Sequence, residues 1–317
     1  MNYEPHVVVV GAINMDIKGK SFRTLVPYTS NPGTIEISAG GVGRNIAENL
    51  ARLKVKTTLI SALSTDPFSA VLVEETKASG INFEHSIVTD KHPSSLFLAV
   101  MNHRGDLINA ISDMSLLSVI TPDFLKTKEE LLLSADYLVL DADIPSDSLD
   151  YILTLGQNAN IPVCVEPVSV KKAVNLLPYL DRITIVTPNR EEAETLAGKE
   201  IKGGAKGVIE VGDAILEKGV KYAIITLGAE GVYLASKDMK RFISSISTVV
   251  EDSVGAGDSM VAGMIYSLCK GSSIYDAIRM GIATATLTLT TKKAVHPELT
   301  REILDKIMEK GFEEGKY

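Results

Sequence analysis

The sequence of 317 residues contains no tryptophan, only two cysteines and five scattered histidines. Cys164 and Cys269 lie in the apolar runs "IPVCVEPV" and "IYSLCKG", and no cysteine or histidine spacing typical of a metal site occurs. This pattern predicts buried free thiols in a reducing compartment. The sequence also lacks a run of ~18 apolar residues that could span a membrane, and "MNYEPHVVVV" lacks the basic start of a signal peptide. We therefore expect a cytoplasmic protein with no membrane partner.

Positive charge is scarce as well. The chain has 40 acidic and 32 basic residues, which gives a net charge of −8. This balance argues against nucleic acid or an anionic membrane as a partner, so any phosphate group must be bound by local donors. With 45% hydrophobic residues, the chain is long enough to bury a substantial core, which is typical of a globular enzyme.

Short β-branched runs alternate with helix-like stretches along most of the chain. Runs such as "VVVVGAI", "YLVLDAD" and "YAIITLG" are typical of buried strands, whereas "GRNIAENLARL" and "GVIEVGDAILEKG" have helical periodicity. This alternation predicts an α/β fold with a mostly parallel sheet covered on both faces. Ligands of such sheets bind beyond the carboxyl ends of the strands. The polar residues expected at those ends are Asp16, Asp66, Asp141, Asp143, Glu166, Asn189 and Thr226.

Two stretches do not follow this alternation. Residues 17–39 have two prolines and two glycines without helical periodicity, and "SSLFLAVMNHRGDLINAI" reads as a hairpin that turns at "NHRGD". We expect residues 17–39 and 94–111 to pair into a small β-lid over an α/β domain made of residues 1–16, 40–93 and 112–317. The outer face of this lid could serve as a homodimer contact. The alternative is that the two stretches are unrelated surface loops.

The stretch "EDSVGAGDSM" places Gly255, Ala256 and Gly257 directly before Asp258. The apolar positions that follow have helical spacing, so the uncovered backbone N–H groups would lie at the positive end of a helix dipole. This arrangement predicts an anion site. Asp258 beside it could accept a proton from a substrate hydroxyl while the N–H groups neutralise a phosphoryl group in transfer.

A structural interpretation of this stretch is also open. An aspartate in the first turn of a helix stabilises the dipole by roughly 0.3–1 kcal/mol, and Asp252 or Ser253 could cap the helix. A nicotinamide-binding fingerprint is disfavoured, because "GVGRNI" ends in the bulky Ile46 where a small residue is needed.

Two further stretches have both a functional and a structural interpretation. In "TPNREEAETLAG", Asn189 and Glu192 have the spacing of a capping box, and Glu192 could instead hold Mg²⁺ through water molecules. In "TLGAEGVYL", Gly228 and Gly231 allow a turn that a flat ring or a phosphate could approach. A plain hairpin turn would explain the same glycines.

The stretch "SAGGVGRNIAENLARL" offers a site for a polyol. Gly40 and Gly41 allow close approach of a ligand, and Asn45 presents a donor and an acceptor at the start of a helix. Asp16, just after the first strand, could accept hydrogen bonds from two hydroxyl groups. Asp16 could also be a simple turn residue.

The order of "GGVGRN", "TPNREE" and "DSVGAGDSM" resembles that of the ribokinase-like (PfkB) family of carbohydrate and nucleoside kinases, over essentially the whole chain. The resemblance implies a three-layer α/β/α fold with a small β-lid, and phosphorylation of an alcohol group with ATP and Mg²⁺. It implies Asp258 as the catalytic base and an anion hole at Gly255, Ala256 and Gly257. The residues that it implies for the substrate are Asn14, Asp16, Gly40, Gly41 and Asn45, and those for ATP are Asn189, Thr226, Gly228 and Gly231.

The same resemblance implies that Glu192 serves Mg²⁺ through water, and that Asp252 and the carbonyl of Val254 occupy a K⁺ position. Within the family, "NMDIKGKSF" and "NAISDMSLL" look most like the subgroup that phosphorylates the 5′-hydroxyl of pseudouridine. In that case Ser30 or Asn31, in "TSNPG", and the "NAISD" segment would reach the base from the lid. The alternative is that these are turn residues. The alternatives are a ribokinase- or fructokinase-like sugar kinase, an adenosine kinase, or a non-catalytic nucleoside-binding sensor.

Overall fold

The central sheet of this computed structural model has eight strands, and the structure describes residues 4–311. The order across the sheet is β14 (Lys240–Ile243), β13 (Val232–Ser236), β12 (Tyr222–Thr226), β11 (Ile185–Val186), β10 (Val163–Glu166), β9 (Tyr137–Asp141), β1 (His6–Val10) and β4 (Lys56–Ile60). The six strands from β12 to β4 in this order pair in parallel, while β13 pairs antiparallel with both β12 and β14.

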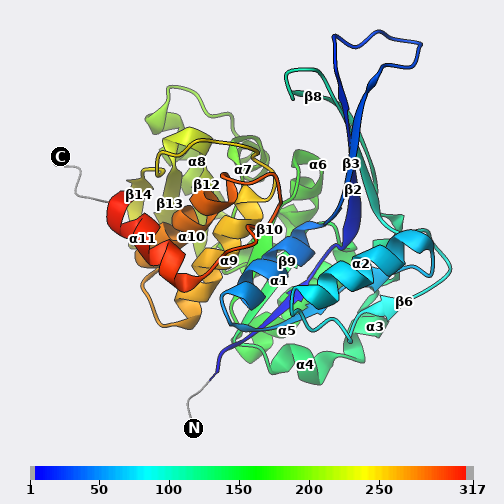
Figure 1. The fold of residues 1–317 in the computed structure, drawn as a ribbon. Helices are drawn as coiled ribbons and strands as arrows, with labels where there is room; N and C mark the ends of the chain where they lie inside the picture. The colour runs from blue at the N-terminus through cyan, green and yellow to red at the C-terminus, as the bar shows by residue number, and fades with distance from the viewer. Residues whose placement is uncertain (1–3, 312–317) are drawn as a thin grey trace.

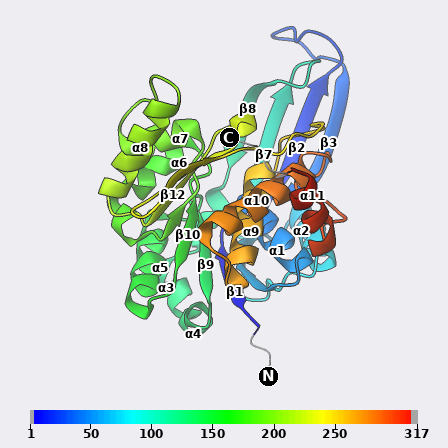
Figure 2. The same cartoon turned by 90° about the vertical axis from the view of Figure 1, so that its left-hand side faces the viewer.

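Alternate residues of the buried strands pack into two separate cores, one on each face of the sheet. In β1, for example, Val8 and Val10 contact one layer of helices, and Val7 and Val9 contact the other. The first layer contains α3 (Pro122–Lys126), α4 (Glu129–Leu133), α5 (Ser146–Ala159), α6 (Val170–Ala173), α7 (Arg190–Ala197) and α8 (Ala205–Glu217). The second contains α1 (Val42–Arg52), α2 (Pro67–Ala78), α9 (Ala256–Cys269), α10 (Ile274–Thr288) and α11 (Arg301–Gly311). Figure 2 shows the two layers on opposite sides of the sheet.

Short elements complete the chain. The 3₁₀ helices are η1 (Ser115–Val119), η2 (Val174–Arg182) and η3 (Gly228–Glu230), and β5 (Ala62–Leu63) pairs with β6 (Ile87–Val88). No helix in residues 4–311 is long and apolar enough to cross a membrane. Both cysteines are free thiols, and Cys164 is fully buried in the sheet.

A separate four-stranded sheet stands away from the body (Figure 1). Its order is β3 (Gly33–Gly40), β2 (Asn14–Ser21), β7 (Leu96–Met101) and β8 (Leu107–Asp113). β7 and β8 form the hairpin expected at "NHRGD", where the N–H of Asn102 donates to the carbonyl of Asp106. We call this sheet the lid. Since β1 ends at Val10 and β2 begins at Asn14, Asp16 belongs to a lid strand and not to the end of the first buried strand.

Candidate active site

Three segments that lie far apart in the sequence meet at the carboxyl ends of the central strands. They are the start of α1, the loop between β11 and α7, and the start of α9. A cavity of about 550 Å³ opens among them, and its lining includes Glu166, Asn189, Glu192, Gly257 and Asp258. We call it the phosphate cavity. It lies at the edge of the sheet where ligands of parallel sheets bind.

A second cavity of about 600 Å³ adjoins the first, and both are lined by Thr226, Gly228 and Gly257. Its other walls include Gly231, the apolar side chains of Ile282 and Ala285 on α10, and Leu289 directly after this helix. An apolar slot joined to a polar cavity suits a ligand with a flat ring at one end and charged groups at the other. We call it the ring cavity.

Another cavity of about 600 Å³ lies at the opposite edge of the sheet, near the starts of β9 to β12. Tyr137, Arg182 and Lys221 are among its lining residues. Of the described residues that line it, none is a predicted site residue, so we place the chemistry at the carboxyl edge.

Gly255 is the N-cap of α9 and has φ 78°, a conformation that favours glycine. A side chain there would also collide with the chain, because a Cβ atom would lie 2.1 Å from the carbonyl oxygen of Ala294. No side-chain cap is present at this end of α9 in the described part of the chain, so the capping by Asp252 or Ser253 is not seen. The N–H of Ala256 donates to the carbonyl of Ser253 and is therefore not free to bind an anion. An anion site here would use other N–H groups of the turn.

Asp258 lies in this first turn of α9 and extends from it toward α1. Its Oδ2 accepts a hydrogen bond from Nδ2 of Asn45 at 2.8 Å. Burial raises the pKa of Asp258 to about 7, the hydrogen bond from Asn45 lowers it, and the negative charge of Asp16 raises it. A carboxylate with this pKa can accept a proton at neutral pH and release it again.

Asp16 and its neighbours on the lid strands lie close to the start of α1. Nδ2 of Asn14 donates to Oδ1 of Asp16 at 2.6 Å, and burial raises the pKa of Asp16. Gly40 leaves room for this carboxylate, since a Cβ atom at Gly40 would lie 2.4 Å from Oδ2 of Asp16. Gly41 is the N-cap of α1, with φ 103°. The structure therefore brings together four of the residues predicted for the substrate and joins them to Asn45.

Asn31 lies apart from this group. It is in the loop between β2 and β3, at the end of the hairpin where Ser21 pairs with Gly33, whereas Asn14 pairs with Gly40 at the other end. Its side chain is used within the loop, where Oδ1 accepts from the N–H of Val26 and Nδ2 donates to the carbonyl of Val26. Because Asn has these turn-forming contacts, its role as a substrate contact stays a prediction.

Asn189 and Glu192 form the capping box that their spacing predicts. Oδ1 of Asn189 accepts from the N–H of Glu192 at 3.0 Å, and Oε2 of Glu192 accepts from the N–H of Asn189 at 2.9 Å. Both residues also line the phosphate cavity, and burial raises the pKa of Glu192. The structural interpretation is therefore confirmed, and the same geometry holds a carboxylate at the cavity wall.

Asp252, predicted for a cation, has partners on both carboxylate oxygens. Nζ of Lys18, from β2 of the lid, lies 3.3 Å from Oδ2, and the N–H of Val254 donates to Oδ1 at 3.0 Å. Among residues 4–311, no three histidine, cysteine, aspartate or glutamate side chains lie close enough together to hold a metal ion. Metal binding by protein side chains alone is thus not built into the described site.

Glu166 is a site residue whose role the sequence did not assign. It ends β10 and lines the phosphate cavity, and its Oε2 accepts a hydrogen bond from Oγ1 of Thr187. Burial raises its pKa well above the usual range, and the charges of Glu192 and Asp258 raise it further. The available signal was its place at a strand end, which it shares with Thr226.

Comparison with known proteins assigns the family. The sequence model of the pfkB family of carbohydrate kinases matches residues 4–301. The chain belongs to this family. The kinase is 32% identical to the pseudouridine kinase of Escherichia coli strain K12, over 95% of each chain. It is 28% identical to the guanosine-inosine kinase of Exiguobacterium acetylicum, over 92% of this chain and 97% of that protein.

Solved structures confirm the predicted ribokinase-like α/β fold. The carbohydrate kinase from Agrobacterium tumefaciens superposes with a TM-score of 0.83 at 27% identity, covering 96% of this kinase and 97% of that chain. The ribokinase of Arabidopsis thaliana, complexed with ribose and ATP, has a TM-score of 0.85 at 22% identity, covering 97% and 99%. The kinase is therefore an ATP-dependent phosphotransferase with an alcohol group as acceptor.

Proposed function

We propose that this kinase transfers the γ-phosphoryl group of ATP to the 5′-hydroxyl of a nucleoside, and that the nucleoside is pseudouridine. The observation that supports the transfer is the position of Asp258, a carboxylate with a pKa of about 7 in the first turn of α9, on the wall of the phosphate cavity. The choice of nucleoside rests on the 32% identity to a pseudouridine kinase over 95% of each chain.

Asp16 and Asn45 would hold the acceptor in this proposal. The carboxylate of Asp16 would accept hydrogen bonds from two ribose hydroxyls, and Asn14, Gly40 and Gly41 would shape the space around them. Asn45 donates one hydrogen of Nδ2 to Asp258, and its second hydrogen would be donated to the sugar. These contacts would place the 5′-hydroxyl beside Asp258.

Asp258 would accept the proton of the attacking hydroxyl. Phosphoryl transfer is largely dissociative, so the proton needs to leave only late and positioning is the larger effect. The backbone N–H groups of Gly255 and Gly257 would stabilise the negative charge on the transferred group. The N–H of Ala256 would join them only by leaving the carbonyl of Ser253. The adenine would lie in the ring cavity, between Thr226, Gly228 and Gly231 on one side and α10 on the other.

The carboxylates of the phosphate cavity fit a divalent cation held mainly by phosphates and water. Glu166, Glu192 and Asp258 line the same cavity, and repulsion among them contributes to the raised pKa of Glu166. Glu192 would hold Mg²⁺ through water, because Mg²⁺ keeps most of its hydration shell. When bound, Mg²⁺ would neutralise charge on the phosphates of ATP.

A K⁺ ion at Asp252 and Val254 would compete with an existing partner. Since Nζ of Lys18 lies 3.3 Å from Oδ2 of Asp252, a monovalent cation would have to displace this ammonium group or bind to backbone carbonyls, that of Val254 included. We therefore propose K⁺ as an activator whose binding is weakened by Lys18.

The lid would join two copies of the kinase. On the face of the lid opposite to Asp16 and Lys18, four apolar residues form one row across the strands. Ile37 on β3 pairs with Ile17 on β2, Ile17 pairs with Leu98 on β7, and Leu98 pairs with Ile111 on β8. Ile37 is 58% exposed and Ile111 is 68% exposed. A row of exposed apolar side chains on one sheet face is typical of a protein interface, and a second copy would cover it.

A panel of acceptors tests the proposed function. We would measure ADP release and phosphorylated product with ATP and Mg²⁺ for pseudouridine, uridine, adenosine, inosine, ribose and fructose. Pseudouridine should have the highest kcat/KM. Uridine is the matched control, because it carries the same base joined through a different atom.

The outcomes separate the alternatives. Faster turnover of ribose, fructose or adenosine would replace pseudouridine by a sugar or adenosine substrate. Nucleoside binding without phosphorylation of any acceptor would favour a non-catalytic sensor.

A further inference from the structure

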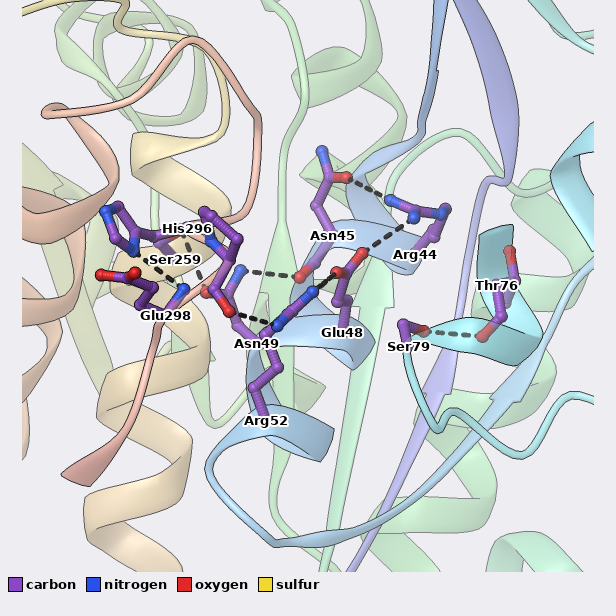
Figure 3. Close-up of polar contacts among 11 residues, drawn as sticks. Arg44, Asn45, Glu48, Asn49, Arg52, Thr76, Ser79, Ser259, His296 and Glu298 are labelled. Carbon is purple, nitrogen blue, oxygen red and sulfur yellow. Dashed lines mark hydrogen bonds and ion pairs between the residues drawn. The ribbon is translucent and has the colours of Figure 1, made fainter. Parts of the chain in front are cut away.

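Arg44 is a buried cation on α1, one residue before Asn45, and only 5% of its surface is exposed. Its Nη2 lies 2.8 Å from Oε2 of Glu48, and its Nη1 donates to Oδ1 of Asn45 at 3.3 Å (Figure 3). The Nε–H group is buried and finds no hydrogen-bond partner among residues 4–311. A buried charge with an unused donor is destabilising relative to an apolar side chain, so its presence indicates a role other than stability.

The contact with Arg44 decides which way the Asn45 amide faces. The oxygen and nitrogen of a primary amide have nearly the same shape, so their orientation depends on the neighbouring donors and acceptors. Arg44 offers only donors and therefore holds Oδ1, which turns Nδ2 toward Asp258. In the opposite orientation, an oxygen would face the Asp258 carboxylate and an N–H group would face the guanidinium.

We propose that Arg44 is a positioning residue: by holding Oδ1 of Asn45, it directs Nδ2 to the carboxylate of Asp258 and keeps that carboxylate aligned for the acceptor hydroxyl. This inference rests on the proposed role of Asp258 as the base. Glu48 holds Arg44 from the other side of the guanidinium and is itself held by Arg52, whose Nε and Nη2 donate to Oε1 at 2.9 and 2.8 Å.

The backbone of Asn45 is held by a second set of buried contacts. Nδ2 of Asn49 donates to the carbonyl of Asn45 at 2.8 Å, Oγ of Ser259 donates to Oδ1 of Asn49, and Oγ1 of Thr288 donates to Oγ of Ser259. This chain of contacts ties α1 to α9 and α10 next to Asp258. Because it fixes the backbone, the side-chain amide is the part of Asn45 whose orientation depends on Arg44.

Charged groups on two other elements bear directly on Asp258. The negative charge of Asp16 on β2 raises the pKa of Asp258, and Glu166 on β10 is repelled by Asp258. Arg44 on α1 lowers the pKa of Asp16. Loss of Arg44 would weaken the hydrogen bond from Asn45, which lowers the pKa of Asp258. The ionised form of Asp258 would then be less stabilised, so its titration should move to higher pH.

Arg44→Met tests the inference, with Arg52→Met as the matched control. Each variant removes one of the two arginines that hold Glu48 and leaves the other in place, but only Arg44 contacts Asn45. Arg44→Met should lower kcat roughly tenfold, because a misaligned hydrogen bond to a charged group acts on the reacting geometry. The KM for the acceptor should rise as well, since the same amide donates to the sugar in the proposed function. Arg44→Met should also move the acidic limb of kcat to higher pH, whereas Arg52→Met should leave all three unchanged.

A measurement without acceptor separates this inference from the proposed function. The ¹⁵N–¹H resonance of the Asn45 side-chain amide, followed from pH 5 to 9, reports the titration of Asp258 in the kinase alone. Its midpoint should be higher in Arg44→Met than in the wild type, whichever acceptor the enzyme uses. Arg44→Lys is a second variant: its ammonium group can pair with Glu48 but cannot also reach Asn45, and its midpoint should move in the same direction.

The Asn45→Ala background completes the test. If Arg44 acts through Asn45, adding Arg44→Met to Asn45→Ala should cause no further loss of kcat. An equal loss in both backgrounds, or a midpoint in Arg44→Met and Arg44→Lys that matches the wild type, would overturn the inference. Turnover of another acceptor would replace pseudouridine as the substrate and would leave the inference about Arg44 unchanged.

Discussion

Nζ of Lys18 lies 3.3 Å from Oδ2 of Asp252, so the lid is joined by an ion pair to the loop that precedes α9. These residues are 234 positions apart in the sequence, and each is partly buried. The ammonium group occupies an oxygen that the sequence predicts as a K⁺ ligand. The ammonium group of Lys18 and a K⁺ ion are therefore expected to compete for the carboxylate of Asp252.

Replacing Lys18 by methionine should strengthen activation by K⁺. The change frees Oδ2 of Asp252, and we expect the K⁺ concentration for half-maximal turnover to fall roughly threefold to tenfold, as for loss of a partly buried ion pair. Turnover would be measured against K⁺ concentration at constant ionic strength, with Li⁺ as the substitute cation. Lys20→Met, on the same face of β2, is the control. If replacing K⁺ by Li⁺ leaves turnover unchanged in both the wild type and Lys18→Met, K⁺ is not an activator and this part of the proposal is wrong.

Asp258→Asn should abolish turnover and leave ATP binding intact, because the amide cannot accept the proton of the hydroxyl. In the wild type, kcat should fall about tenfold per pH unit below the Asp258 pKa of about 7, since only the ionised form acts as a base. Turnover that persists in Asp258→Asn would reject this residue as the base. ATP affinity by calorimetry is the control for an intact nucleotide site.

The same residue should limit the stability of the kinase at high pH. The pKa of Asp258 is about 7 in the folded protein and 3.8 in a free side chain, so the folded state binds the proton more tightly. The stability that this group contributes is thus fully present below about pH 4 and is lost as the pH rises through 7. Asp258→Asn should raise Tm over the wild type at pH 8 by a few degrees, and by less at pH 5. Equal gains at both pH values would contradict the raised pKa.

Much of this fold could be predicted from the sequence, because buried parallel strands are continuous β-branched runs such as "VVVVGAI" and "YAIITLG". The edge strand β14 was missed, since "KRFI" is mostly exposed and charged. Motif residues such as Asp258 and Asn45 could be named, but their mutual contact could not. The pairs Lys18–Asp252 and Asn45–Asp258 join distant segments, and their geometry depends on how helices and lid pack.

Gly257 and Gly255 should respond to alanine in opposite ways. A Cβ atom at Gly257 meets nothing within 4 Å, and the residue is in α9, where alanine favours the helix by up to about 1 kcal/mol. The added methyl group would extend into open space beside two cavities, so we expect a higher Tm together with a lower kcat/KM for ATP. Gly255→Ala should instead lower Tm, because of its φ of 78° and the carbonyl of Ala294. Thermal unfolding and ATP kinetics check both variants, and unchanged kinetics in Gly257→Ala would argue against phosphates beside this residue.

Ile37→Lys should separate the proposed dimer into monomers. Ile37 is 58% exposed and lies in the apolar row formed with Ile17, Leu98 and Ile111, so a charge there would be buried without a partner in a lid-to-lid contact. Mass measured by light scattering during gel filtration should halve.

Thr34→Lys is the matched control for this variant, because it adds the same charge to an exposed position on the opposite face of β3. It should leave the mass unchanged. Since β2 carries both Ile17, in the apolar row, and Asp16, in the substrate site, loss of the dimer should also loosen the lid and raise the KM for the acceptor more than the KM for ATP. A wild type that is already monomeric at micromolar concentration would reject the lid as a dimer contact.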